Sequence, residues 1–176
     1  MAGQRLTDKS ALNNQTGTGD LFMVVDVSDT TGSADGTSKK IDSKFVIQTD
    51  KITLSNAEIN ALRTTPKTLV SAPGSGYAVM PINAVIVCTY AAPTVSGKPA
   101  MHIGHQSGSG TDYGAFKANP MVGQTTDNVY RFVGNSNIDR TSSIDNVALI
   151  LSNNTTADFN GGFTAVVYIT YQIVLL

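Results

Sequence analysis

Residues 163–176 read FTAVVYITYQIVLL, and this stretch decides the fold. Its odd positions from Phe163 to Ile173 are apolar or aromatic, whereas its even positions are Thr, Val, Tyr, Thr and Gln. A period of two over eleven residues predicts a β-strand that buries one face. Residues 78–90 repeat the pattern, and the predicted apolar face there holds Met80, Ile82, Ala84, Ile86, Cys88 and Tyr90. Two long strands therefore anchor the predicted fold.

Shorter strands are predicted on both sides of these two. Residues 129–133 and 147–151 are mostly apolar and are bounded by Asn, Asp, Ser or Gly, which are turn formers. Strands that recur with Gly-rich turns and no helical periodicity are typical of an antiparallel sandwich or barrel. About eight strands fit into residues 64–176 at roughly 8–12 residues for each strand and its turn. The sequence thus predicts an all-β protein.

The N-terminal third differs in kind. Residues 20–27, DLFMVVDV, predict one buried strand, and a cluster of turn formers follows it. Residues 39–41 and 44–48 are the candidate partners of that strand, so we expect a hairpin or strand pair with a long loop. Ser55 to Glu58 has the form of a capping box and predicts a short helix over about residues 56–63. We interpret this helix as a connector.

A boundary is predicted near Pro66, where the helical pattern stops. It divides the chain into an N-terminal attachment segment, residues 1–63, and a β-domain, residues 64–176. A lone strand pair is marginal in water, and this segment has few large apolar residues, so we expect it to need a partner surface. Residues 1–19 are polar and rich in Gly, Asn and Thr, which suits an arm that is disordered or that orders only when docked.

Composition excludes several classes of function. The chain has 12 Lys+Arg and 13 Asp+Glu in 176 residues, so it has no net field to attract nucleic acid or an anionic membrane. The single cysteine, Cys88, cannot form an internal disulfide. We infer neither a signal peptide nor a membrane span, because no long apolar run is present. We expect no cofactor.

The residues that could carry chemistry do not form a convincing site. On a strand, His102 and His105 would point to opposite faces, which does not suit binding of one metal ion. We therefore interpret them as solvent-exposed loop histidines and not as metal ligands. Residues 72–76, APGSG, lack the Lys of a phosphate-binding loop and predict a turn. The carboxylates beside Asn, Ser or Thr predict local turn contacts and no catalytic pair, and they are Asp127, Asp139, Asp145 and Asp158. We therefore predict no enzymatic activity.

Two long stretches, residues 68–97 and 159–176, contain no charged side chain. Exposed strands of monomers usually carry Lys or other charges against edge pairing, so part of this surface is predicted to be buried between subunits. The alternative is that Thr, Ser and Asn alone keep the outer face soluble. The predicted interface residues are Ile169, Tyr171, Ile173, Val174, Leu175 and Leu176.

Three pieces of the sequence resemble a known family. Residues 20–41, DLFMVVDVSDTTGSADGTSKKI, look like the N-terminal segment of structural proteins of tailed bacteriophages, particularly fibre and head-fibre proteins. Residues 65–82, with Leu-Val, Ala-Pro-Gly-x-Gly and then an apolar strand, resemble the opening of a small phage jelly roll. Residues 147–173 are similar to the closing strands of that domain. Residues 91–146 show no such resemblance.

The resemblance implies a non-enzymatic virion protein with a C-terminal jelly-roll β-sandwich. It favours a location at the capsid surface over one at the tail. It implies a head fibre or capsid decoration protein that forms a homotrimer and binds the major capsid protein or another virion protein. Apolar residues of the N-terminal segment would make the capsid attachment, namely Leu21, Phe22, Met23, Val24, Val25, Val27, Phe45, Val46 and Ile47.

Two alternatives stay open beside this interpretation. In the first, the same trimer is a tail-mounted receptor-binding protein, and Tyr113 and Phe116 contact a host surface glycan. In the second and weaker one, the chain is an enzyme of the depolymerase type.

Overall fold

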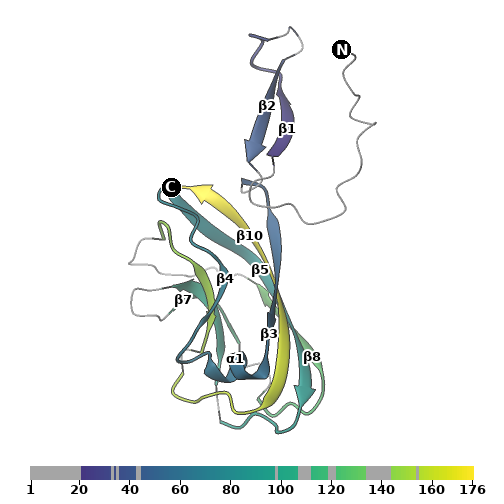
Figure 1. The fold of residues 1–176 in the computed structure, drawn as a ribbon, viewed down its shortest axis with the longest axis vertical. Helices are drawn as coiled ribbons and strands as arrows, with labels where there is room; N and C mark the ends of the chain where they lie inside the picture. The colour runs from purple at the N-terminus through teal and green to yellow at the C-terminus, as the bar shows by residue number, and fades with distance from the viewer. Residues whose placement is uncertain are drawn as a thin grey trace. The chain divides into compact units, whose positions relative to one another are not determined.

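A computed structural model describes residues 21–32, 34, 36–42, 45–97, 99–106, 112–118, 122–133, 144–153 and 155–176 (Figure 1). The expected arm, residues 1–19, lies outside the described residues. The chain separates into two compact units, Met1–Val46 and Ile47–Leu176. Each unit has its own strands, and they are considered in turn.

The first unit contains an antiparallel hairpin. Strand β1, Leu21–Asp26, pairs with β2, Thr37–Asp42, in a register that runs from Leu21 opposite Asp42 to Asp26 opposite Thr37. The predicted hairpin is therefore confirmed. Its second strand is residues 37–42, and the alternative partner at residues 44–48 is wrong, because the next strand starts only at residue 48 and belongs to the second unit.

The loop of the hairpin is tied by side chains. Asp26 accepts hydrogen bonds from the backbone N–H and the hydroxyl of Ser28, and Asp29 accepts the same pair from Thr31. Lys39 of β2 forms an ion pair of 2.5 Å with Asp29. The hydrogen bond from Lys39, followed by those from Thr31, lowers the pKa of Asp29 to about 2.

The described part of the second unit is a sandwich of two four-stranded sheets. The first sheet has the order β3-β10-β5-β8, and the second has the order β4-β9-β6-β7. All pairs are antiparallel. The strands are β3 Gln48–Leu54, β4 Lys67–Val70, β5 Tyr77–Ala91, β6 Met101–Gln106, β7 Asp112–Ala118, β8 Asn128–Val133, β9 Leu149–Ser152 and β10 Gly162–Leu175.

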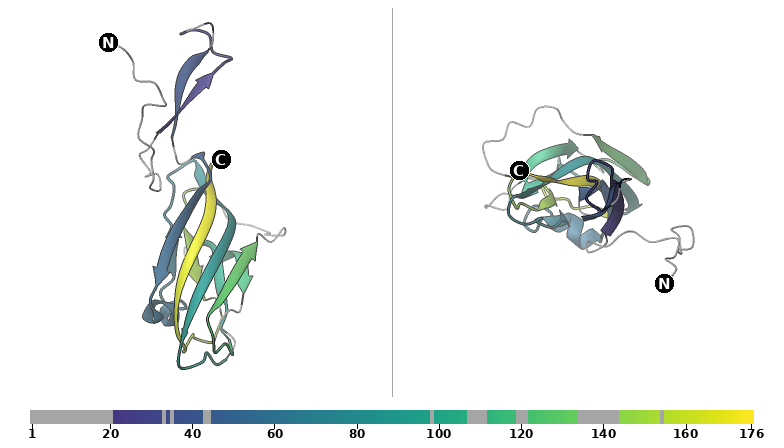
Figure 2. Two further views of the ribbon diagram at one scale, coloured as in Figure 1. Left: turned by 90° about the vertical axis from the view of Figure 1, so that its right-hand side faces the viewer. Right: turned by 90° about the horizontal axis from the view of Figure 1, so that it is seen from above.

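These pairs are nested along the chain. The first strand of the sandwich pairs with the last, β3 with β10, and the inner pairs are β4 with β9, β5 with β8 and β6 with β7. One long antiparallel ribbon wound into two sheets is the topology of a jelly roll. The all-β prediction is confirmed, and the left view of Figure 2 shows β10 lying between β3 and β5.

The division of the chain lies after residue 46 and not near residue 63 as predicted. Strand β3 is an integral strand of the first sheet, and only with it does the sandwich reach eight strands. Helix α1, Asn56–Ala61, begins with the predicted capping box between Ser55 and Glu58. Ile59 of this helix and Leu62 after it are buried in the core, so the helix closes one end of the sandwich and is more than a connector.

The core fills the space between the two sheets. Strand β10 contributes its odd positions, and Val167 and Ile169 are completely buried. The largest fully buried side chains of the described residues are Leu54, Ile59, Leu62, Ile86, Met101, Ile103, Leu149, Ile150, Leu151, Phe159 and Phe163. The alternation of strand β10 that was predicted from the sequence is confirmed.

Strand β5 departs from its predicted alternation near its start. Thr170 of β10 lies opposite Asn83, and the next residue, Tyr171, lies opposite Pro81, so Ile82 is an extra residue in a β-bulge. A bulge of one residue exchanges the two faces of a strand. Val79 is consequently buried, whereas Met80 and Ile82, which were assigned to the apolar face, are exposed.

Candidate functional site

The two histidines lie in the sandwich and not in a solvent-exposed loop. His102 and His105 are both on β6, and both are buried. Strand β6 pairs with β9 in a regular register, so the two side chains point to opposite faces. The Nε2–H of His105 donates a hydrogen bond of 2.7 Å to the backbone carbonyl of Val79 on β5, in the other sheet. This histidine links the two sheets.

The single cysteine, Cys88, is buried as well. Burial raises the pKa of the Cys88 thiol to about 12, so it stays protonated at neutral pH and is a poor nucleophile. Within the described ranges, no group of three His, Cys, Asp or Glu side chains could hold a metal ion. None of the helices in the same ranges is long and apolar enough to cross a membrane.

The carboxylates singled out in the sequence hold loops. Asp145 accepts a hydrogen bond of 2.6 Å from the N–H of Gly76, and Asn146 accepts one of 2.9 Å from the N–H of Gly74. Both glycines have positive φ angles, which confirms the predicted turn at residues 72–76.

Two of the other carboxylates make longer-range contacts. Asp127 accepts a hydrogen bond of 2.8 Å from the N–H of Tyr90. Asp158 forms an ion pair with Arg63, 95 residues away in the chain. Asp139 lies outside the described residues.

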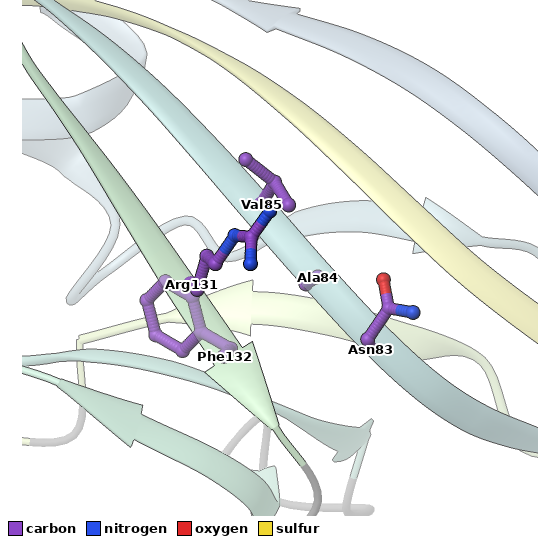
Figure 3. Close-up of a pocket in the computed structure, with 5 residues that line it drawn as sticks. All are labelled: Asn83, Ala84, Val85, Arg131 and Phe132. Carbon is purple, nitrogen blue, oxygen red and sulfur yellow. The ribbon is translucent and has the colours of Figure 1, made fainter.

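An open pocket of about 250 Å³ lies between β5 and β8 (Figure 3). It is lined by Asn83, Ala84, Val85, Arg131 and Phe132. Figure 3 shows the Arg131 side chain reaching along the sheet toward Val85. Because the lining contains no carboxylate, imidazole or thiol, it offers no acid, base or nucleophile for catalysis. Arg131 makes the pocket a place where a negatively charged group could bind.

The hairpin of the first unit exposes apolar side chains on both faces. Paired residues of two strands share a face, so Met23 and Val25 lie on one face, and Val24 and Ile41 lie on the other. The exposed fractions are 70% for Met23 and 57% for Val25, and Val27 in the loop is 75% exposed. The described apolar side chains of the strand that was predicted to be buried are therefore exposed.

Four further residues of the predicted attachment set are placed as follows. Phe45 and Ile47 are exposed, and Val46 is half-buried. Val24 is 37% exposed. The side chains of Leu21 and Phe22 lie outside the described residues.

The predicted subunit interface needs a correction. Ile169 and Tyr171 lie in the core of their own sandwich, so neither can form an interface with another chain. Ile173 packs against the same core. Of the predicted interface residues, only those at the C-terminal end of β10 reach the surface, where Leu175 and Leu176 are exposed and Val174 is half-buried. The pattern of odd positions in β10 reflected burial within one chain.

The outer face of the first sheet, by contrast, carries an apolar surface. One row across its four strands consists of Lys51, Tyr168, Val85 and Arg131, and the next row consists of Thr53, Val166, Val87 and Val129. We call the apolar and basic members of these rows the outer patch, and they are Lys51, Val85, Val87, Val129, Arg131, Val166 and Tyr168. The even positions of β10, which are less apolar than the odd positions, supply its centre.

The predicted receptor contacts, Tyr113 and Phe116, belong to β7 at an edge of the second sheet. Their backbones pair with His105 and Ile103 of β6. The positions of their side chains lie outside the described part of the chain, so the receptor hypothesis stays a prediction.

Comparisons with known proteins give one structural similarity. No protein-family model matches the chain, and no curated protein matches its sequence. A search of solved structures finds similarity to the capsid of Ralstonia phage GP4, with a TM-score of 0.41 and 13% sequence identity. The alignment covers 72% of this chain and 84% of that chain.

Proposed function

We propose that this chain is a non-enzymatic structural component of a bacteriophage virion, a head fibre or capsid decoration protein that attaches through its N-terminal hairpin. The observation that carries the proposal is the exposure of apolar side chains on both faces of the β1–β2 hairpin, including Met23 and Val25. The resemblance of residues 20–41 to the N-terminal segment of phage fibre and head-fibre proteins supports the same conclusion.

The hairpin has a physical reason to bind another protein. A two-stranded hairpin is marginally stable in water, and in its described residues only Gly36 is buried. Burying one Met or Val side chain contributes about 1.5–3 kcal/mol relative to leaving it exposed. A capsid surface that covers one face of β1 would therefore both stabilise the hairpin and attach the chain to the capsid. Strand β1 pairs only with β2 among the described strands, so its other edge can also add to a sheet of the partner.

The jelly roll would then project from the particle as a compact head. We propose that it forms a homotrimer through the end of β10, where the side chains of Val174, Leu175 and Leu176 are all apolar. Three linked hairpins would bind far more tightly than one, because the first contact raises the effective concentration of the other two. A weak attachment in each chain is then sufficient.

Co-sedimentation of the full chain with empty capsids of the phage that encodes it tests this proposal. We expect the wild-type chain to sediment with the capsids and the double variant Met23→Asp, Val25→Asp to remain in the supernatant. A matched control, Thr68→Asp plus Ser71→Asp, adds the same charge at exposed positions of the second unit and should bind like the wild type. Equal binding by wild type and hairpin variant, or no binding by the wild type, would contradict the proposal.

A further inference from the structure

We propose that the outer patch of the first sheet is a second docking surface, which binds another virion protein whose own surface places apolar side chains between carboxylates. The partner is sought in the virion because this inference rests on the proposed function. The surface is distinct from the hairpin, since all its residues belong to the second unit.

The register fixes the geometry of the patch. Tyr168 lies at the centre of the sheet, between Lys51 on one side and Val85 on the other, and Arg131 ends the row. The two cations are thus three strand intervals apart, or about 14 Å at roughly 4.8 Å per interval. Lys51 leans over the ring of Tyr168, with its Nζ 6.0 Å from the ring centroid.

The apolar part of the patch has the character of a protein interface. Val129 is 56% exposed and Tyr168 is 37% exposed, and between them Val85, Val87 and Val166 are half-buried. An aromatic and aliphatic centre with charged residues at its rim is the arrangement found in protein–protein interfaces. A glycan site would need several converging polar groups, whereas the centre of this patch is mostly valine.

Charge decides what kind of partner fits. On this face of the four strands, the described side chains include two cations and no carboxylate. Asp50, beside Lys51 on β3, belongs to the opposite face, where it accepts a hydrogen bond of 2.9 Å from the hydroxyl of Tyr171. Two copies packed face to face would bring Lys51 and Arg131 of one chain against those of the other, and like charges at an interface are unfavourable. Carboxylates on a different protein would neutralise both.

A photo-crosslinking experiment in assembled virions tests this inference. Tyr168 is replaced by the photoreactive p-benzoylphenylalanine in the full chain, particles are purified and irradiated, and the crosslinked peptides are identified by mass spectrometry. We expect a crosslink to a different virion protein, at a segment with apolar and acidic residues. The same photoreactive group at Thr68, exposed on the second sheet, is the matched control and should give little of this product.

Charge reversal gives the second readout. Adding Lys51→Glu and Arg131→Glu to the photoreactive chain should lower the crosslink yield by at least about tenfold, because carboxylates then face carboxylates. Lys51→Gln with Arg131→Gln should lower it less. Circular dichroism of each purified variant checks that the sandwich is intact.

The outcomes separate the two proposals. Crosslinks only to a second copy of this chain, only to polysaccharide, or to no other molecule would overturn the inference, provided that the chain is present in the particles. A crosslink that is equally strong after charge reversal would also overturn it. Absence of the chain from purified particles would overturn the proposed function itself, and the inference with it.

Discussion

The imidazole of His105 donates its Nε2–H to the backbone carbonyl of Val79, and this hydrogen bond of 2.7 Å crosses the interior of the sandwich. His105 belongs to the second sheet, and Val79 belongs to the first. Since a carbonyl oxygen can only accept, the ring must carry a proton on Nε2. One polar side chain thus joins two sheets whose facing side chains form a hydrophobic core.

Replacing His105 with Leu should lower the free energy of unfolding by about 1–3 kcal/mol, because the buried carbonyl of Val79 loses its donor. Urea denaturation followed by circular dichroism measures the change. Gln106→Leu, at an exposed position of the same strand, is the control and should change stability little. Equal stability of wild type and the His105 variant would show that the hydrogen bond is not a structural link.

The stability of the sandwich should depend on pH through Glu58. The ion pair of 2.5 Å with Lys67, followed by the hydrogen bonds from Ser55, lowers the pKa of Glu58 to about 2. A carboxyl whose pKa is lower in the folded state stabilises that state above its unfolded pKa, and the contribution is lost as pH falls toward the folded pKa.

We therefore expect Glu58→Gln to lower the urea midpoint at neutral pH, with the difference from wild type shrinking between about pH 5 and pH 2. The measurement is a set of urea titrations across this range. Asp158→Asn, which breaks the pair with Arg63, serves as a control for loss of an exposed ion pair away from the helix cap. A difference that stays constant with pH would rule out titration of Glu58 as its cause.

The sequence predicted correctly those elements whose structure depends on a local pattern of residues. The alternation of strand β10 and the capping box at Ser55 both have local causes, and the structure contains both. The place of β3 was missed because its pairing with β10 joins residues more than a hundred positions apart, for example Thr49 and Thr170. The short polar run of β3 gives no local sign of that partner.

The bulge in β5 offers a direct test of register. Because Ile82 is the extra residue, deleting it leaves the pairs Tyr171–Pro81 and Ile173–Val79 unchanged. We expect the deletion variant to fold with Val79 still buried. Deleting Val85 from the regular part of the strand should instead prevent folding, because every residue on one side of the deletion would change face. Two-dimensional NMR spectra of both variants distinguish these outcomes, and loss of dispersion in the Ile82 deletion would contradict the assigned register.

The candidate surfaces were harder to predict than the fold. The need of the hairpin for a partner was predicted from the sequence because a lone strand pair is marginal in water, whereas the resemblance to phage proteins implied attachment through the residues of β1. The outer patch was missed because alternation marks Val166 and Tyr168 only as the less apolar face of β10. Their partners Lys51, Val87 and Arg131 come from other strands, so the patch exists only once the sheet order is known.

Gly36 links the conformation of the hairpin to its proposed role. It has a φ of 111°, and a Cβ there would lie 2.7 Å from the carbonyl oxygen of Asp26 and 2.9 Å from the Cα of Val27. We expect Gly36→Ala to distort the hairpin, since a side chain is strained at this φ and two of the three closest atoms belong to the backbone. Gly32→Ala is the matched control, because its Cβ would meet only the side chain of Thr37, at 3.2 Å or more.

Two measurements follow from this difference. Cross-strand NMR contacts between Val25 and Ser38, which lie opposite each other, should weaken in Gly36→Ala and persist in Gly32→Ala. Capsid co-sedimentation should fall in the same order, while the urea midpoint of the sandwich stays the same in both variants, because the hairpin and the sandwich are separate units. If Gly36→Ala loses the cross-strand contacts and still binds capsids like the wild type, the folded hairpin is not the element that attaches the chain.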